Sequence, residues 1–475
     1  MQIPILNGIF SDGSSDYRTS YPRNYVPVPK KQGVSQGYLR PADGIVQAGS
    51  GPGIGRGGIN WNGTLYRVMG TKLCSVAKDG SVSVLGDVGA GGQCSLDYSF
   101  DRLGVSSGGR LYFWDGSTLS QVTDSDLGTV LDVRWVSGYW LCTDGDVAVV
   151  TDLTDPTSVS PLRYGSAESD PDPIKAVDQQ HNEIYLFGRH TIQVAQNVGG
   201  DNYPFQDVPG AQINKGIVGT YAYSDYQSTY AFVGSGRNEA IAVYMTSPGD
   251  CTKISTREID QILKGYTEAQ LSTVVVESRL FDAHEHLYIH LPDKTIVYDH
   301  EASKVVGESV WFTVDSGGLN PAAYRARNIV WCYDRWNVED PTSTAFGYLS
   351  DEVASHYGSS VGWEFATAVV YAEGNDAIVH ELELVTLAGR QDMGVNPTVY
   401  TSYSHDGVTW SQERAKSVGA QGERTKRIAW RQNGRIRHTR VQKFRGTSDC
   451  RLSFTRLEAQ IEPLFVRPTS GTPGG

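Results

Sequence analysis

The chain has 475 residues, with 53 glycines and 26 tyrosines but only four methionines, and charged residues make up 20% of it. This length exceeds what one ordinary core needs, and the composition is typical of an all-β protein rich in turns. The net charge is −12, yet residues 411–456 hold 13 basic and three acidic side chains, so the remainder carries −22. This balance disfavours broad nucleic-acid binding and favours docking between surfaces of opposite charge.

Targeting signals and metal-binding cysteine patterns are not expected. No stretch approaches 18 apolar residues, and the first residues lack a basic segment followed by an apolar one, so neither a membrane span nor a signal peptide is predicted. The six cysteines are scattered without CxxC or Cys/His spacing. Free thiols in a reducing compartment therefore fit better than a disulfide framework or a zinc site.

Residues 1–59 show little regular pattern. Pro22, Pro27, Pro29 and Pro41 favour extended segments, and residues 49–58 are dominated by glycine. The sequence therefore predicts an extended N-terminal arm that lies against a neighbouring domain or subunit.

A repeated unit, in which a polar turn is followed by an aromatic-rich strand, starts near residue 60. Its members begin at Asn62, Gly108, Ser137, His181, Gln227, His284 and Arg327. The mean spacing is about 44 residues, and a four-stranded blade needs roughly 40 to 50, so the pattern predicts a β-propeller of six or seven blades over residues 60–350. The step from Gly108 to Ser137 is too short for one blade, and a solenoid or a pair of sandwiches is the alternative architecture.

One helix interrupts this pattern. Ser255 and Glu258 form a candidate capping box before the run IDQILKGYTEAQL. A helical insertion near residues 255–272 is therefore predicted, and it lengthens the repeat at that point.

The clearest hairpin lies at residues 277–299. His284, His286 and His290 have the same parity on one strand, so they face the same side, and alternate histidines can chelate zinc or copper. The apolar residues of the strand occupy the opposite face. We therefore prefer solvated or subunit-facing histidines on a polar blade surface to a metal site.

The rhythm changes after about residue 351. Six strands joined by Gly- and Asp-rich turns are predicted, at residues 365–372, 380–387, 398–404, 427–431, 439–444 and 450–458. They suggest a C-terminal β-sandwich over residues 351–465 with a basic face, and the composition of residues 466–475 predicts a flexible tail.

Two glycine motifs match catalytic patterns by letter. Residues 53–58 satisfy GxGxxG and residues 104–108 satisfy GxSxG. A phosphate cradle and a nucleophile elbow both require a helix directly afterwards, whereas strands follow here. A glycine loop and a hairpin turn are the preferred interpretations, and no cofactor is expected.

Residues 404–410 resemble the Asp-box of sialidase-type propellers, with Asp406 in a tight turn and Trp410 beneath it. The motif lacks one residue and occurs once, outside the repeat. It supports a hairpin and says little about glycan hydrolysis, which also needs paired carboxylates in a pocket.

A basic run near the C-terminus is the candidate protein interface. Its arginines are Arg427, Arg431, Arg435, Arg437, Arg440 and Arg445. On a strand, alternate arginines form a stripe while Ile428, Ile436 and Val441 point inward. Docking to a protein surface is preferred to a plain solvated face and to direct DNA contact.

Five stretches, taken in order along the chain, resemble the tail-hub proteins of short-tailed phages (podoviruses), also called packaged DNA stabilisation proteins or tail accessory factors. The stretches are YLRPADGI (38–45), KGIVGTY (215–221), IDQILKGYT with its extension (259–271), ESRLFDAHEHLYIHLP (277–292) and GRIR (434–437). The related hub of other short-tailed phages is similar in carrying a β-propeller.

The resemblance implies a structural virion protein without catalysis. In that family six copies form a ring beneath the portal and its head-to-tail adaptor ring, close the channel together with a tail needle, retain the packaged DNA and attach tailspikes. The expected location is the phage tail, after synthesis in the host cytoplasm, and genomic DNA passes through the ring. The alternatives are a carbohydrate-active propeller enzyme of sialidase type and a monomeric propeller that binds proteins.

Overall fold

The computed structural model describes residues 1–10, 18–30, 37–165, 172–199, 202–371, 376–391, 393–447 and 450–464. The predicted tail, residues 466–475, lies outside these ranges. The chain divides into two compact units, one formed by residues 45–299 and 323–349 and the other by residues 1–44, 300–322 and 350–475. Among the described residues, no helix is long and apolar enough to cross a membrane.

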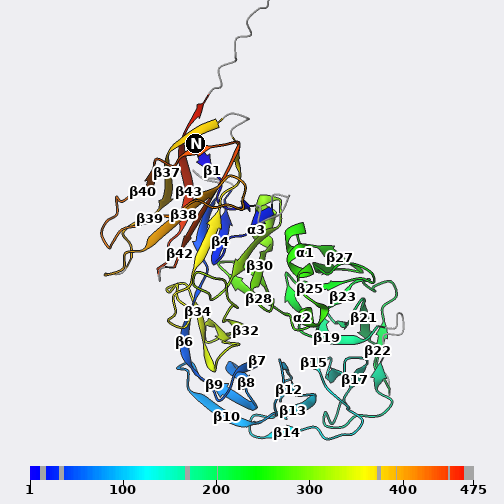
Figure 1. The fold of residues 1–475 in the computed structure, drawn as a ribbon. Helices are drawn as coiled ribbons and strands as arrows, with labels where there is room; N and C mark the ends of the chain where they lie inside the picture. The colour runs from blue at the N-terminus through cyan, green and yellow to red at the C-terminus, as the bar shows by residue number, and fades with distance from the viewer. Residues whose placement is uncertain are drawn as a thin grey trace, which may run out of the picture. The chain divides into compact units, whose positions relative to one another are not determined.

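The first unit is a β-propeller (Figure 1). The strand pairing among the described residues gives it seven antiparallel sheets. The first four sheets are β7 (Gly55–Trp61), β8 (Thr64–Met69), β9 (Lys72–Val76) and β10 (Val82–Asp87); β11 (Ser95–Tyr98), β12 (Leu103–Ser107), β13 (Arg110–Trp114) and β14 (Leu119–Gln121); β15 (Asp132–Val136), β16 (Tyr139–Thr143), β17 (Ala148–Val150) and β18 (Tyr164–Gly165); β19 (Ile174–Gln180), β20 (Glu183–Gly188), β21 (Ile192–Asn197) and β22 (Phe205–Asp207).

The other three sheets continue the same order. They comprise β23 (Gly216–Ile217), β24 (Tyr223–Tyr226), β25 (Thr229–Ser235), β26 (Ala242–Ser247) and β27 (Asp250–Lys253); β28 (Val275–Phe281), β29 (His284–His290) and β30 (Thr295–Asp299); β32 (Arg327–Cys332), β33 (Arg335–Glu339), β34 (Ala345–Ser350) and β6 (Gly44–Ser50). The predicted propeller of six or seven blades is thus confirmed, with seven sheets.

Strand β6 closes the ring. It precedes the first sheet in the chain but is the outer strand of the last one, beside β34. The first strand of the last sheet, β32, in turn contacts β7 of the first. Part of the predicted N-terminal arm therefore belongs to the propeller, because β34 would otherwise present unpaired backbone groups at a sheet edge.

Tight turns explain the spacing of the sequence repeat. In most sheets a two-residue turn with two positive φ angles joins the first and second strands, as at Asn62-Gly63 (50° and 76°) and His181-Asn182 (51° and 65°). Such turns match the twist of the strands they connect. The similar turn at Gly108-Gly109 instead joins the second and third strands of its sheet, β12 and β13. The predicted repeat therefore starts one hairpin too late in this sheet, which makes the step from Gly108 to Ser137 too short.

Aromatic and glycine residues allow neighbouring sheets to approach closely. Trp140 of β16 packs on Phe113 of β13 with ring centroids 5.0 Å apart. A Cβ on Gly104 of β12 would lie 2.5 Å from the Trp140 ring, so only glycine fits there.

A buried ion pair links the last sheet to the first. Arg67 Nη1 of β8 lies 3.0 Å from Glu339 Oε2 of β33, and both side chains are fully buried. Asn328 Nδ2 of β32 also donates to that carboxylate at 2.6 Å. The ring is thus closed by a specific polar contact as well as by β6.

The predicted helical insertion is confirmed as α1 (Arg257–Lys264) and α2 (Glu268–Leu271), but its caps differ from the prediction. Thr256, not Ser255, caps α1 by accepting from Ile259 N. The capping box is formed at α2, between Thr267 and Gln270. Ser255 instead donates to Asp260 Oδ1 at 2.7 Å.

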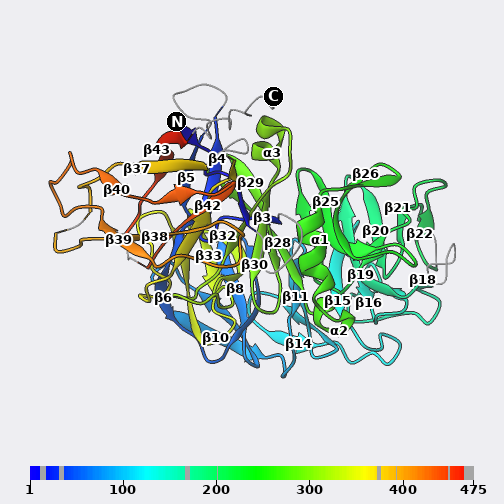
Figure 2. The same cartoon turned by 45° about the horizontal axis from the view of Figure 1, so that its top comes forward.

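The second unit contains a β-sandwich (Figure 2). One sheet holds β4 (Tyr25–Pro29), β5 (Gly37–Pro41), β43 (Phe454–Leu464), β37 (Asp376–Thr386) and β40 (Ile428–Arg431), with β1 (Gln2–Ile3) beside β43 and β41 (Arg435–Ile436) beside β37. The other holds β35 (Trp363–Ala366), β36 (Val370–Tyr371), β42 (Thr439–Gly446), β38 (Thr398–Ser404) and β39 (Arg414–Ser417). The unit also includes β2 (Gly8–Phe10), β3 (Arg18–Ser20), α3 (His300–Val306) and β31 (Val310–Val314).

The sandwich confirms the predicted C-terminal fold but recruits the N-terminus. Tyr25 of β4 packs against Trp363 and Phe454 with centroid distances of 5.3 and 5.6 Å, and its hydroxyl donates to Leu452 O at 2.7 Å. Residues 25–41 are therefore core strands instead of an extended arm. Their prolines lie in β4 and β5, and β4 is an edge strand, where a missing N–H is tolerated.

Candidate docking surface and polar clusters

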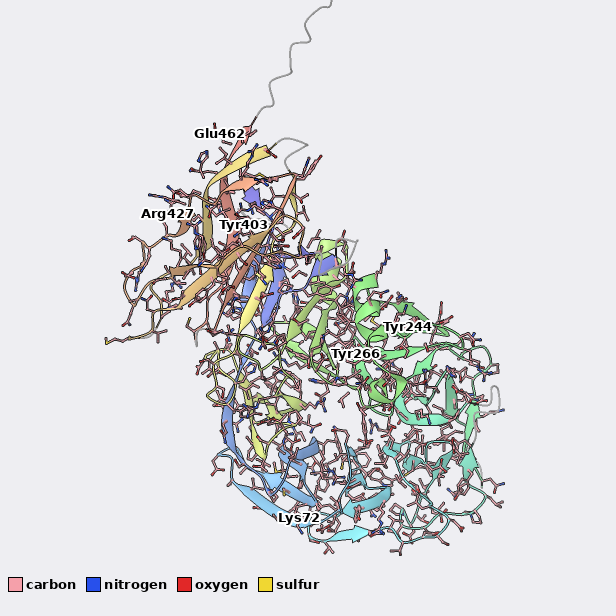
Figure 3. All side chains as sticks on the ribbon, viewed as in Figure 1. Lys72, Tyr244, Tyr266, Tyr403, Arg427 and Glu462 are labelled. Atoms are coloured by element: carbon pink, nitrogen blue, oxygen red, sulfur yellow. The ribbon has the colours of Figure 1, made fainter. Side chains whose placement is uncertain are left out.

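Three of the predicted interface arginines share the edge of the first sandwich sheet. Arg427, Arg431 and Arg435 lie in or beside β40 and β41, and their side chains are 57%, 79% and 51% exposed (Figure 3 marks Arg427). Each has an acidic partner on the neighbouring β37. Arg427 lies 2.8 Å from Glu381 Oε1, and Arg431 lies 3.2 Å from Glu381 Oε2. The surface is therefore mixed in charge.

A hollow of about 690 Å³ lies at this edge. Its lining includes His380, Glu381, Arg431 and Arg435. His380 Nε2 is 2.7 Å from Glu462 Oε2 of β43. We call this region, from Arg427 to Arg437 with β37 beside it, the arginine edge.

The other three predicted interface arginines differ in how deeply they are buried. Arg437 is exposed and extends the arginine edge. Arg445, on β42, is half-buried and forms an ion pair with Glu413. Arg440 is 3% exposed, so its prediction as an interface residue is wrong.

Packing explains why Arg440 is inside. Its guanidinium lies 3.9 Å from the centroid of the Tyr403 ring and donates to Asn433 O at 2.6 Å and to Gln442 Oε1 at 2.9 Å. Burial lowers the pKa of Arg440 to about 10. Strand parity alone could not reveal that Tyr403 of the neighbouring strand β38 and the segment that carries Asn433 cover this side chain.

The histidine face of β29 is buried, which corrects the predicted solvated surface. His286 and His290 are each 1% exposed, and only His284 is partly accessible, at 33% for its side chain. The opposite face of β29, which carries Leu287 and Ile289, is buried as well, so both faces of this strand are covered.

Two separate polar groups result on this strand. His290 Nε2 lies 3.0 Å from Glu277 Oε2, and its Nδ1 lies 3.0 Å from Thr295 Oγ1. His284 and His286 both approach the Asp299 carboxylate. Burial lowers the pKa of both His286 and His290, which favours their neutral forms.

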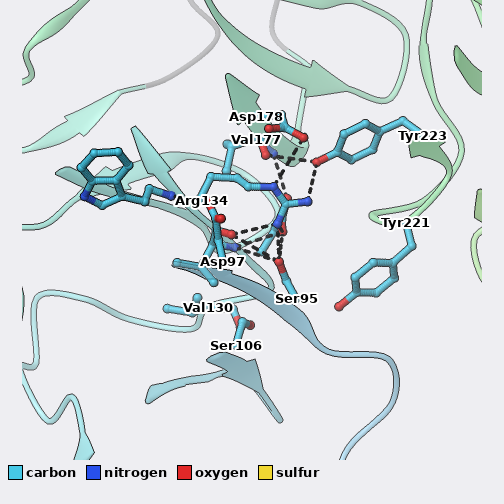
Figure 4. Close-up of polar contacts among 12 residues, drawn as sticks. Ser95, Asp97, Ser106, Val130, Arg134, Val177, Asp178, Tyr221 and Tyr223 are labelled. Atoms are coloured by element: carbon cyan, nitrogen blue, oxygen red, sulfur yellow. Dashed lines mark hydrogen bonds and ion pairs between the residues drawn. The ribbon is translucent and has the colours of Figure 1, made fainter. Parts of the chain in front are cut away.

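Another polar cluster gathers around Arg134 in the propeller (Figure 4). Arg134 of β15 donates to Ser95 Oγ at 2.7 Å and to the Tyr223 hydroxyl at 3.1 Å, and its Nε is 3.4 Å from Asp178 Oδ2. These partners come from β11, β24 and β19. One guanidinium thus ties together four consecutive sheets, and the spacing of the repeated unit carries no signal for this contact.

Several aspartates surround the one positive charge of Arg134 in this cluster. Burial raises the pKa of Asp132, which lies 3.2 Å from Arg134 Nη1 and accepts from Val177 N at 3.0 Å. Burial also raises the pKa of Asp97 to about 6. For Asp225 of β24, partial loss of hydration within the cluster and the nearby Asp178 raise the pKa to about 7, while part of the side chain remains exposed to solvent. Each nitrogen of Arg134 already meets a protein oxygen, so this guanidinium is a structural tie, not a binding group for a substrate carboxylate.

The two glycine motifs are built into blades. Residues 55–58 of the GxGxxG stretch form part of β7, where a Cβ on Gly55 would lie 2.2 Å from the Glu339 carboxyl carbon. Ser106 of the GxSxG stretch lies in β12 and donates to Val130 O at 2.8 Å. Strands occupy the positions where a phosphate loop or a nucleophile elbow needs a turn into a helix.

The Asp-box-like stretch forms a hairpin, as predicted. Asp406 Oδ1 accepts from Val408 N at 2.9 Å and from Thr409 N at 2.7 Å, and these backbone bonds hold the pKa of its carboxyl well below its usual range. Ser404 and Trp410 form an isolated bridge across the turn. The carboxylate is therefore used in capping the turn.

Comparison with known proteins identifies the family. The model described as Bacteriophage P22 Gp10, beta-propeller, matches residues 1–354, and the model described as Bacteriophage P22 Gp10, beta-sandwich, matches residues 362–462. Tail hub protein gp10 of Salmonella phage P22 is 28% identical over 485 aligned residues, which cover 97% of this chain and 99% of that protein.

Two similar solved structures have low sequence identity to this chain. The N-terminal domain of Nup159 has a TM-score of 0.41 and 8% identity and covers 68% of this chain and 97% of its own. The Pan2 WD40 domain of Neurospora crassa has a TM-score of 0.41 and 8% identity, with coverages of 65% and 96%. The two family models, by contrast, match nearly the whole sequence, and the chain therefore belongs to the phage P22 Gp10 family of tail hub proteins.

Proposed function

We propose that this tail hub protein works as a non-catalytic ring of six copies that closes the portal channel after DNA packaging. In this role it meets the head-to-tail adaptor ring on one side and the tail needle and tailspikes on the other, and it resides in the virion tail. The observation that supports a hub role most is the match of both family models along nearly the full chain.

The charge distribution suits a DNA conduit. Outside residues 411–456 the chain carries −22. Acidic walls repel phosphate and discourage DNA from adhering during ejection. Basic groups are then available for protein contacts.

We further propose that the arginine edge docks against another tail protein. Arg427, Arg431 and Arg435 already have carboxylate partners, so this surface offers alternating charges and little net positive potential. A phosphate backbone requires net positive charge, whereas a protein surface with complementary charges matches an alternating pattern. Docking to protein is therefore favoured over direct DNA contact.

A charge-reversal experiment tests this docking. Replacing Arg431 and Arg437 with Glu should leave the monomer folded, since both side chains are exposed, but should block its incorporation into tails at physiological salt. The matched control is Lys78→Glu with Arg110→Glu, two exposed positions on the propeller that give the same change in net charge.

Incorporation is measured by adding the purified variants to particles that lack the hub and quantifying the bound protein. The control should bind as the unmodified chain does. Normal incorporation of the Arg431/Arg437 variant would remove the arginine edge as a docking surface while leaving the hub assignment intact.

A further inference from the structure

Three side chains that can bind a metal ion, His284, His286 and Asp299, lie together on the hairpin formed by β29 and β30. His284 and His286 lie on β29 with one residue between them, so both side chains project from the same face of the strand. Asp299 is the last residue of β30 and is paired in register with His286. The sheet itself therefore brings two imidazoles and a carboxylate together.

The ligand atoms of these three residues lie close enough together to share one ion. His284 Nδ1 lies 2.8 Å and His286 Nε2 lies 3.3 Å from Asp299 Oδ2, and one ligand atom from each residue lies within 4.8 Å of the others. Ligand atoms at the usual bond lengths on a tetrahedral zinc ion are separated by about 3.3 Å. The 2.8 Å contact is shorter than this separation, so the His284 and Asp299 side chains must move slightly apart to hold an ion.

Burial gives the group an enclosed base and one accessible side. Asp299 and His286 are 2% and 1% exposed, and the Phe281 ring stacks on His286 with centroids 5.0 Å apart. The His284 side chain is 33% exposed, so an ion can enter from that side and keep a water as its fourth ligand.

We propose that His284, His286 and Asp299 bind a divalent transition-metal ion of the zinc class, which cross-links β29 to β30. Two imidazole nitrogens and one carboxylate oxygen form a donor set that suits Zn²⁺ and does not suit Mg²⁺ or Ca²⁺, which prefer oxygen ligands. His290 is not part of this set, because it is engaged with Glu277 and Thr295. The proposal is independent of the docking role of the arginine edge.

The alternative use of the same residues is a hydrogen-bonded group without an ion. The positive charge of Arg279 contributes to the lowered pKa of His286. The Arg279 guanidinium also donates to the Tyr288 hydroxyl at 2.8 Å. A metal-free network would leave the affinity of the chain for zinc low and non-stoichiometric, which makes the two possibilities separable by titration.

The test is a titration of the full-length chain, stripped with a chelator, with Zn²⁺ by calorimetry and with Co²⁺ by visible absorption. The unmodified chain should bind one equivalent and give the intense visible bands of tetrahedral Co²⁺. His284→Asn and Asp299→Asn should each weaken Zn²⁺ binding at least about 100-fold. His380→Asn is the matched control, because it removes another histidine with a carboxylate partner, 2.7 Å away, from an exposed position.

Asp299→Asn changes a buried group, so the partly exposed His284→Asn variant provides the decisive comparison if the former does not fold. Zn²⁺ should also raise the thermal unfolding temperature of the unmodified chain and of His380→Asn, but not of His284→Asn. The proposal is overturned by the absence of a one-equivalent site in the unmodified chain, or by equal affinities for His284→Asn and His380→Asn.

Discussion

Individual charged residues in this protein divide into structural ties and surface groups, and sequence position alone does not separate them. Arg134 and Arg440 hold neighbouring strands together from inside, whereas Arg431 and Arg437 face outward. All four are arginines on or beside β-strands. The neighbours that surround each side chain in the folded protein decide which role it takes.

Arg440 and Arg437 should therefore respond oppositely to charge reversal. Arg440→Glu places a carboxylate beside Asn433 O and Gln442 and should lower the free energy of unfolding by about 3 kcal/mol or more. Arg437→Glu should change it by less than about 0.5 kcal/mol. Urea unfolding followed by tryptophan fluorescence measures both, and equal effects would show that Arg440 is not buried in solution.

The aspartates of the propeller give a prediction for pH. The pKa of Asp225 is raised to about 7, whereas an unfolded aspartate titrates near about 4. At a pH between these two pKa values, Asp225 is protonated in the folded protein and ionised in the unfolded chain. The free energy of unfolding therefore decreases as pH rises through this range. Asp225→Asn should be neutral near pH 4 and stabilising near pH 8, by on the order of 1 kcal/mol because the side chain is exposed and solvent screens it.

The control for this effect is Glu352→Gln, which removes one exposed carboxylate from the other unit. The difference in unfolding midpoint between Glu352→Gln and the unmodified chain should be the same at pH 4 and at pH 8. A constant difference for Asp225→Asn across the range would contradict the raised pKa.

At the scale of elements, the hairpin pattern predicted the propeller and the helical insertion well, because alternation and turn residues are local signals. Pairings between distant segments were missed. Strand β6 joins the last sheet from the start of the chain, and β4 and β5 enter the sandwich beside β43. The prolines and glycines of residues 1–59 suggested an arm, since a sequence pattern records the local backbone and not the partner of an edge strand.

The polar clusters show the same limit. The His284/His286 pair was visible as a pattern, but Asp299 became its partner only through the register of β29 and β30. The Arg134 cluster joins residues of four sheets, from Ser95 to Tyr223. No spacing rule within one strand could find either set complete.

Closure by β6 leads to a stability prediction. A Cβ on Gly347 of β34 would lie 2.0 Å from Val46 O of β6, so Gly347→Ala should push the two strands apart and cost about 1 to 3 kcal/mol. Gly92→Ala is the control, because no atom lies within 4 Å of the corresponding position. Thermal unfolding of the two variants tests this, and similar midpoints would mean that β6 is not tightly paired.

The whole molecule combines a closed ring of sheets with a sandwich whose strands come from both ends of the chain. Both units are thus locked by N-terminal segments: β6 in the propeller, and β1, β4 and β5 in the sandwich. The pairing of β6 with β34 covers a sheet edge that would otherwise be open, which suits a structural tail hub protein.

DNA retention by particles made without this chain tests the hub role most directly. Phage with the coding sequence interrupted is grown, and the heads are separated by density and scored for genome content over time, with the chain supplied in trans as the control. Heads are expected to fill with DNA and then to lose it, and the supplied protein should restore retention. Stable, fully infectious particles made without the chain would rule out the hub role.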